Sequence, residues 1–303
     1  MDLSILTVSF RCAEDTLRCF HSLENGGAEG LDWELLVGDN GSGDIERLGA
    51  LKDVPRVRLF PSTENIGFGR ENNRLAEAAR GEYLLCLNPD TIVPRGTLKV
   101  LVDHLRTHPE CGVCGPLLTN PDGSRQDSWG EPFGLAWEFC EAHYLQNWYR
   151  KRAWKRQLAS LSPIWNVGFT SGACLCVSKQ LWMRISGFCP KFFMNHEDVD
   201  FCDQVRNAGI EVHVLSPCCV IHAEGAAQRQ NWRRYTFHRF QSKWLYHSRR
   251  FQGGKLFFVR LLWWESLAWK IVIGTLILRR EGRTRLPGFF DAARWAITQQ
   301  MDS

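Results

Sequence analysis

Leu84-Leu85-Cys86-Leu87-Asn88-Pro89-Asp90 is an apolar run that ends abruptly in a polar triplet. Consecutive apolar residues without alternation are typical of a strand that is buried on both faces. Asp90 would then lie at the C-terminal end of that strand, which is where open α/β sheets bind their ligands. Asn-Pro-Asp is also common in turns, so the triplet alone does not distinguish a binding site from a plain turn.

Two further polar clusters favour a binding site. Asp39-Asn40-Gly41-Ser42 ends an earlier apolar stretch in the same manner, and Glu197-Asp198-Val199-Asp200 follows much later in the chain. Acidic residues at the start of a helix also cap free N–H groups and favour the helix dipole. The second cluster therefore has an ordinary structural explanation beside the functional one.

The first half of the chain alternates apolar strands with amphipathic segments. Strands are expected at 3–10, 33–38, 57–60, 82–87 and 112–117, and helices at 13–23, 44–51, 69–79 and 97–107. This alternation predicts an α/β fold with a mainly parallel central sheet and helices on both faces. After an irregular segment at 120–162, interpreted as an insertion or flap that could contact an acceptor, we expect a strand at 173–178, helices at 179–185 and 199–207, and a last strand at 211–215.

Composition limits the class of protein. The 303 residues are 44% hydrophobic, enough for a substantial core, and the net charge of only +4 argues against a nucleic-acid-binding protein. No secretory signal precedes the first strand, and the twelve cysteines are scattered, so the expected compartment is the reducing cytoplasm. Cys111-Gly112-Val113-Cys114 has no second ligand pair, so ordinary buried thiols are favoured over zinc or redox chemistry there.

The C-terminal third is basic and aromatic. No acidic residue occurs between Glu224 and Glu265, whereas Arg and Lys recur there among Trp, Tyr and Phe. The apolar stretch 256–278 contains Trp263 and Trp269 but is interrupted by charges, which argues against a helix crossing a bilayer. We expect a helical extension at 227–303 that lies on the inner surface of the cell membrane as a peripheral element; packing on the catalytic domain or at a homodimer interface is the alternative.

Motifs of several enzyme classes are absent. The sequence has no Gly-x-x-x-x-Gly-Lys-Ser/Thr loop, no Gly-x-Ser-x-Gly elbow, and only Gly41-Ser42-Gly43 in place of a dinucleotide fingerprint. What remains is the set of carboxylates at strand ends. They suit a nucleoside diphosphate held by Mg²⁺ or Mn²⁺, since these cations prefer one or two carboxylates together with phosphate oxygens.

Four segments in order carry a resemblance to a known family. They are Leu3–Phe10 with Asp39-Asn40-Gly41-Ser42, residues 65–73 (Asn-Ile-Gly-Phe-Gly-Arg-Glu-Asn-Asn), Leu87–Asp90, and residues 195–202 (Asn-His-Glu-Asp-Val-Asp-Phe-Cys), with a weaker match at 222–225. Together they resemble the inverting family 2 glycosyltransferases of the GT-A fold, and within them the bacterial rhamnosyltransferase-like group. The family has Asp-x-Asp at its metal site, whereas Asn88 stands first here, a departure that is usual in that group.

The resemblance implies roles for individual residues. Asp39 would accept the imide N–H of uracil or thymine, Asp90 would hold the cation with His222 as a further ligand, and Asp198 would be the catalytic base with Glu197 as second choice. The other residues implied in donor binding are Val8, Asn40, Ser42, Asn65, Gly67, Phe68, Asn72 and Asn88.

The resemblance covers residues 1–226, which it implies form one GT-A domain with a nucleotide-sugar half at 1–118 and an acceptor and catalytic half at 119–226. The implied reaction transfers a sugar, L-rhamnose above all, from dTDP to a lipid-linked or polysaccharide acceptor. A UDP-sugar donor is one alternative. A second alternative is an inactive nucleotide-sugar-binding scaffold, which would show no turnover. A third is a membrane adaptor, which would show no nucleotide affinity.

Overall fold

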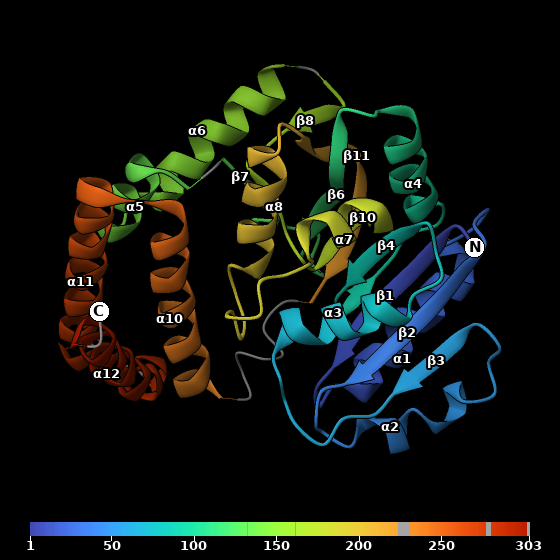
Figure 1. The fold of residues 1–303 in the computed structure, drawn as a ribbon, viewed down its shortest axis with the longest axis horizontal. Helices are drawn as coiled ribbons and strands as arrows, with labels where there is room; N and C mark the ends of the chain where they lie inside the picture. The colour runs from blue at the N-terminus through green and yellow to red at the C-terminus, as the bar shows by residue number, and fades with distance from the viewer. Residues whose placement is uncertain (132, 161, 224–230, 277–279, 302–303) are drawn as a thin grey trace. The chain divides into compact units, whose positions relative to one another are not determined.

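The apolar run that ends at Leu87 forms β4 (Tyr83–Leu87), and all five of its residues are buried. β4 pairs in parallel with β1 (Leu3–Ser9), which pairs in parallel with β2 (Trp33–Asp39), and these two strands are also buried throughout. Continuous apolar sequence is what a strand covered by helices on both faces requires. Figure 1 shows these strands side by side at the centre of the sheet.

The computed structural model describes residues 1–131, 133–160, 162–223, 231–276 and 280–301. The chain divides into two compact units. Unit 1 consists of Met1–Pro132, Leu161–Pro190 and Glu197–Ala226, and unit 2 of Phe133–Ser160, Lys191–His196 and Ala227–Ser303. This division differs from the expected one, because much of the irregular segment at 120–162 is helical and belongs to unit 2.

The main sheet of unit 1 has the order β3-β2-β1-β4-β10-β6-β11-β5, with β8 paired to β11. The remaining strands of unit 1 are β3 (Val57–Phe60), β5 (Thr91–Ile92), β6 (Cys111–Thr119), β8 (Ile164–Asn166), β10 (Cys174–Ser178) and β11 (Glu211–His222), and a separate small pair is formed by β7 (Trp129–Gly130) and β9 (Phe169–Thr170). The last long strand is thus longer than the predicted 211–215 and reaches His222.

The prediction of a mainly parallel sheet is confirmed for the central strands, while the short strands β5 and β8 pair antiparallel with β11 and one longer strand interrupts the sheet. β10 is antiparallel to both of its neighbours, β4 and β6, and separates them. The sequence pattern predicted this strand but not its direction, because direction depends on the path of the chain through the preceding insertion.

Helices cover the sheet of unit 1 at most of the expected positions. They are α1 (Ala13–Ser22), α2 (Asp44–Arg47), α3 (Phe68–Ala78), α4 (Thr97–Thr107), α7 (Lys179–Ile185) and α8 (Glu197–Asn207). The helix expected at 44–51 is divided into α2 and a short 3₁₀ turn at Gly49–Leu51. A continuous core, which includes Leu35, Leu85 and Leu101, lies between the sheet and the helices α1 and α4.

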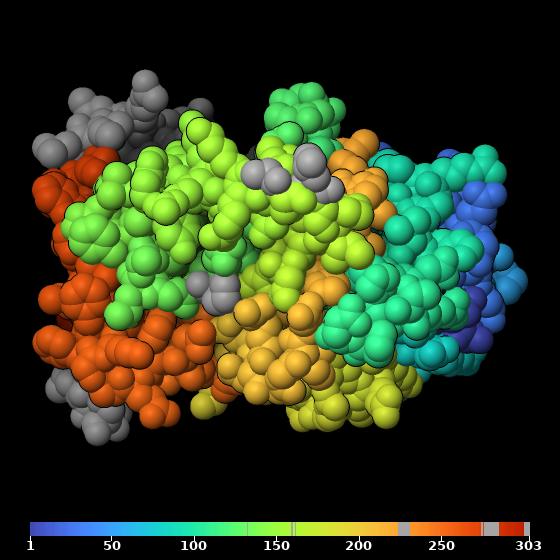
Figure 2. Space-filling model, turned by 90° about the horizontal axis from the view of Figure 1, so that it is seen from above, coloured from blue at the N-terminus to red at the C-terminus, as the bar shows by residue number. Residues whose placement is uncertain are grey.

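Unit 2 is helical. It contains α5 (Leu135–Ala142), α6 (Gln146–Ala159), α10 (Trp232–Arg250), α11 (Gly253–Leu276) and α12 (Arg280–Met301). Phe240 and Trp244 of α10, Trp263 of α11 and Phe289 of α12 form its core. Lys151, Arg152, Lys155 and Arg156 of α6 are exposed, and Figure 2 shows the surface of this helix in yellow-green.

One basic residue of the C-terminal tract lies inside unit 2. Lys243 of α10 is buried, and its Nζ lies 2.7 Å from Glu138 and 2.6 Å from Glu141, both on α5. Burial alone would lower the pKa of Lys243, but these two carboxylates raise it above its ordinary value. Lys243 therefore joins α10 to α5. The charge pattern along the chain suggested instead that this lysine belongs to a basic surface.

Candidate active site

The predicted site residues of unit 1 come together at one edge of the sheet. β2 and β4 both pair in parallel with β1, so Asp39 and the Asn88–Asp90 turn leave the sheet at the same edge. His222 ends β11 and is paired with Thr91 of β5, directly after Asp90. The C-terminal ends of parallel strands are the usual place for ligands in such sheets.

Asp90 and His222 form the most compact polar group at this edge. His222 Nε2 lies 3.2 Å from Asp90 Oδ1, and both side chains are largely buried. Asn88 Nδ2 also lies 3.2 Å from His222 Nε2. Three polar atoms from two chain segments thus meet at one point.

Gln126 determines which atom of the His222 ring carries the proton. The Gln126 amide nitrogen donates to Asn120 Oδ1 and to the His222 carbonyl, each at 2.7 Å, so its Oε1 is left to face His222 Nδ1 at 2.9 Å. Nδ1 must donate to that oxygen, and Nε2 of the neutral ring therefore presents a lone pair toward Asp90. A carboxylate oxygen and an imidazole lone pair that face each other fit a shared divalent cation, since both are ligands that such ions accept.

Asp198 lies in the first turn of α8, as the sequence predicted for the acidic cluster. Its carboxylate accepts hydrogen bonds from Gly172 N at 2.8 Å and from its neighbour Val199 N at 2.9 Å. Desolvation raises the pKa of Asp198 above its ordinary value despite these bonds. Asp198 remains partly exposed, whereas Glu197 is only 6% exposed beside Gly69 of α3. Of the two, Asp198 is the one that a substrate can reach.

A single backbone segment connects Asp198 with the Asn88–Asp90 turn. Gly172 N binds Asp198, and the next residue, Ala173, accepts a hydrogen bond from Asn88 N at 2.9 Å. This segment leads into β10, and it reaches the edge only because β10 is antiparallel to β4. The antiparallel direction of β10 therefore places residues 172–173 so that they bond both to Asp198 and to the turn that carries Asp90.

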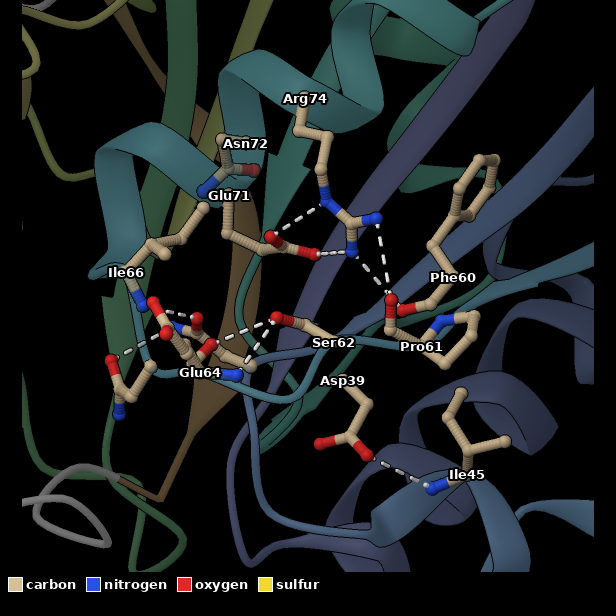
Figure 3. Close-up of polar contacts among 12 residues, drawn as sticks. Asp39, Ile45, Phe60, Pro61, Ser62, Glu64, Ile66, Glu71, Asn72 and Arg74 are labelled. Atoms are coloured by element: carbon tan, nitrogen blue, oxygen red, sulfur yellow. Dashed lines mark hydrogen bonds and ion pairs between the residues drawn. The ribbon is translucent and has the colours of Figure 1, made fainter.

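Asp39 is buried at the end of β2, where it organises the following turn. Its Oδ1 accepts Ser42 N at 2.9 Å and Ser42 Oγ at 2.7 Å. Its Oδ2 has only a long contact of 3.4 Å with Ile45 N, which is drawn in Figure 3. A carboxylate can accept about four hydrogen bonds, so Asp39 can still accept one from a ligand.

The loop at 65–67 is held against this turn. Asn40 donates to Asn65 Oδ1 at 3.1 Å and accepts Ile66 N at 2.9 Å. Gly41 allows the approach: its φ is +77°, and a Cβ there would lie 2.5 Å from the carbonyl carbon of Glu64. Asn40 and Gly41 thus shape the site, while Asn65 is the more exposed partner.

The remaining predicted donor-binding residues lie close to this loop along the chain or at the end of β1. Gly67, with a φ of +92°, precedes α3, and Phe68 begins that helix. Val8 is buried in β1. Asn72 is 0% exposed and donates to Phe68 O at 3.0 Å, so its side chain is buried and bonded to the first turn of α3.

Glu71 and Arg74 were not predicted as functional residues, but they fix α3 beside the site. Gly38 of β2 leaves room for the buried Glu71 carboxylate, since a Cβ at Gly38 would overlap it. Arg74 Nε donates to Glu71 at 2.9 Å, and Arg74 Nη2 donates to Phe60 O at 3.2 Å. Figure 3 shows the guanidinium between the helix and the end of β3.

Sequence reasoning missed Gln126 and Gly172. Gln126 lies in the irregular segment and carries no motif, and Gly172 acts through its backbone N–H, for which no side chain gives a signal. Of the weaker match at 222–225, Glu224 and Gly225 lie outside the described residues.

The fold is of the GT-A type, with carboxylates at the ends of its parallel strands. The family model for glycosyl transferase family 2 matches residues 4–181, more than half of the chain. The chain belongs to this family and is a glycosyltransferase.

Similar proteins agree with this assignment. N-acetylglucosaminyl-diphospho-decaprenol L-rhamnosyltransferase of Mycobacterium tuberculosis is 30% identical over 261 residues, which is 81% of each chain. Rhamnosyltransferase WbbL of Escherichia coli is 24% identical and covers 66% of this chain and 76% of its own. The mannosyltransferase PcManGT from Pyrobaculum calidifontis, solved with GDP-Man and Mn²⁺, has 13% identity and a TM-score of 0.59 over 99% of this chain and 87% of its own, and shows the shared fold.

Proposed function

We propose that this glycosyltransferase transfers L-rhamnose from a dTDP-activated donor to a lipid-linked acceptor, with inversion in one displacement. The similarity to two rhamnosyltransferases supports the sugar, and the lipid diphosphate named for the mycobacterial relative supports the acceptor class. The observation that carries the reaction type is the segment 172–173, which binds Asp198 on one side and the Asn88–Asp90 turn on the other.

Asp198 acts as the general base in this proposal. The attacking hydroxyl of the acceptor must lose a proton as its oxygen bonds to the anomeric carbon and the nucleoside diphosphate leaves. Desolvation raises the pKa of Asp198, and a carboxylate with a raised pKa is a stronger base than an ordinary aspartate. Gly172 N holds the Asp198 side chain in place, so the base does not have to be ordered during the reaction.

Asp90 and His222 would hold a divalent cation beside the donor diphosphate. When bound, Mg²⁺ or Mn²⁺ would neutralise charge that develops on the leaving group. Gln126 keeps His222 in the tautomer whose Nε2 lone pair would face the cation.

Asp39 would recognise the nucleobase. Uracil and thymine both present an imide N–H, and Asp39 Oδ2 retains the capacity to accept it. Such recognition does not by itself separate dTDP from UDP, so a UDP-sugar-dependent enzyme is the second candidate.

Nucleotide preference tests this proposal directly. We expect dTDP to raise the Tm of the full chain more than UDP and far more than GDP, with the increase larger in the presence of Mn²⁺, because ligands that bind the folded state stabilise it by mass action. Release of dTDP from dTDP-rhamnose that depends on a lipid diphosphate acceptor would establish turnover. A preference for UDP would select the second candidate, stabilisation without turnover would identify a scaffold, and the absence of any nucleotide effect would contradict the proposal.

Peripheral membrane attachment through unit 2 is part of the same proposal. No helix in the described ranges is both long and apolar enough to cross a bilayer. Trp263 lies in the core of unit 2 and cannot reach a membrane, but Phe257, Leu261 and Trp269 of the same helix are 73%, 55% and 51% exposed. Exposed apolar residues together with nearby basic ones suit an anionic lipid surface.

We expect the full chain to co-sediment with vesicles that contain an anionic lipid and to be partly released by high salt, because salt screens the attraction. The double substitution Phe257→Ser/Leu261→Ser should reduce sedimentation severalfold, since it removes apolar area but leaves the core of unit 2 intact. Val100→Ser, which changes a 48% exposed residue of α4 in unit 1, is the matched control and should have no effect. If the wild type stays in the supernatant at low salt, the membrane proposal fails.

A further inference from the structure

Three potential metal ligands meet at the opposite end of the sheet from Asp90. His104 comes from α4, Cys111 is the first residue of β6, and His213 lies near the start of β11. All three are buried. His104 Nε2 lies 2.9 Å from His213 Nδ1, and the potential ligand atoms of the three residues lie within 4.8 Å of one another. His222 ends β11, so this group is separated from the active site by the length of that strand.

The contacts of His213 indicate which ring atom is available. Its Nε2 lies 2.7 Å from a carboxylate oxygen of Glu211, which can only accept, so Nε2 carries the proton. Nδ1 then presents its lone pair toward His104. A histidine whose second ring nitrogen donates to a carboxylate is the usual arrangement of histidine ligands in metal sites.

The available atoms match zinc. Two imidazole nitrogens and one thiolate are a donor set that Zn²⁺ prefers, at bond lengths of about 2.0–2.1 Å to nitrogen and about 2.3 Å to sulfur. In a tetrahedral complex these bond lengths place the nitrogens about 3.4 Å apart and each nitrogen about 3.6 Å from the sulfur. The 2.9 Å between His104 Nε2 and His213 Nδ1 is about 0.5 Å below this nitrogen–nitrogen distance, and the upper limit of 4.8 Å on the nitrogen–sulfur separations is about 1.2 Å above theirs, so modest side-chain adjustments suffice.

We propose that His104 Nε2, His213 Nδ1 and Cys111 Sγ bind one Zn²⁺, with a water molecule in the fourth position. The thiol proton of Cys111, which now donates to Val113 O at 3.2 Å, is released when zinc binds. His104 Nε2, which in this structure donates to the His213 Nδ1 lone pair at 2.9 Å, gives up its proton and the ring takes the tautomer protonated on Nδ1, so that both histidines bind zinc as neutral ligands. The ion joins α4 to the first residues of β6 and β11, two strands against which this helix packs. Its role is structural, and it is independent of the cation beside Asp90.

The CxxC motif at 111–114 therefore contributes one ligand rather than two. Cys114 is also buried, but its thiol donates to Leu101 O at 3.4 Å and belongs to the hydrophobic core. No motif marks this site in the sequence, because His213 lies about a hundred residues after Cys111 and only His104, seven residues before it, is near. Cys114 supplies a matched control for experiments on Cys111.

Metal analysis and cobalt substitution test the proposal on the full chain. We expect one equivalent of zinc to co-purify with the protein. After zinc removal, Co²⁺ should produce a thiolate-to-cobalt charge-transfer band and the visible bands of a tetrahedral site, and one equivalent of Zn²⁺ should abolish them. Added zinc should raise the Tm of the apo protein by at least about 3 °C.

Variants assign the signal to these residues. Cys111→Ser should lose the charge-transfer band and the zinc-dependent rise in Tm, and His213→Gln should lose the tetrahedral spectrum, while circular dichroism verifies that each variant is folded. Cys114→Ser and Asp90→Ala should retain both signals. The proposal is overturned if folded wild-type protein gives no thiolate-to-cobalt band, if Cys111→Ser keeps it, or if Asp90→Ala removes it.

Discussion

Asp198→Asn is expected to lower kcat by at least about a hundredfold and to leave the affinity for the donor nearly unchanged. Asparagine preserves the size of the side chain and can still accept the hydrogen bond from Gly172 N, but it cannot take the proton of the acceptor hydroxyl. The base is needed only in the transition state, so its loss affects turnover rather than donor binding. Steady-state rates with a saturating acceptor, together with calorimetric donor affinity, measure the two effects separately.

The same residue gives a pH profile with a definite sign. Because Asp198 must be ionised to act, kcat/KM should fall as the pH falls through its pKa, and desolvation places this decline above the ordinary range of an aspartate. The residual activity of Asp198→Asn should lack this decline. Glu197→Gln is the discriminating control. Because Glu197 is buried, this substitution should lower kcat/KM by less than tenfold. A larger loss from Glu197→Gln than from Asp198→Asn would transfer the role of base to Glu197.

Asp90→Ala is expected to lower kcat/KM by about a hundredfold or more, because cation stabilisation of a leaving group contributes several kcal/mol. It should also weaken donor binding in the presence of Mn²⁺ and remove most of the difference that EDTA makes to the wild type. Donor titrations with Mn²⁺ and with EDTA, on both proteins, measure this directly.

Asp103→Ala, which removes an exposed carboxylate from α4, is the control for a general effect of charge and should behave as the wild type. Equal sensitivity of Asp90→Ala and wild type to EDTA would contradict the assignment of Asp90. Attention would then turn to His222 and Asp200.

The strands and their polar ends were predictable because they depend on local pattern. A continuous apolar run such as 84–87 specifies a buried strand, and the residue type that follows it marks the functional edge. The same reasoning placed Asp198 at the start of α8. These features need no knowledge of how distant parts of the chain meet.

The features that were not predicted depend on contacts between residues that are distant in sequence. The direction of β10, the contact of Gln126 with His222 and the burial of Lys243 between two glutamates are all set by residues far away in sequence. The charge pattern predicted a basic surface around Lys243 because it reflects only the order of charges along the chain. It contains no information on the two glutamates of α5 that pair with this lysine. Likewise, the cysteine spacing could not indicate two histidines on other elements.

The reversed strand β10 also has a consequence for how the enzyme is assembled during synthesis. Leu87 of β4 pairs with Cys174, so β4 leaves the ribosome long before the strand that covers its second edge. Until then its backbone groups and apolar side chains present an open edge to other chains, a known route to association. Pairing with β10 closes that edge and brings Ala173 to Asn88 in the same event. The growing chain therefore closes this open edge and fixes the Asn88–Asp90 turn in one event, before Asp198 and His222, which follow β10 in the sequence, complete the site. A fragment that ends before β10 has neither benefit.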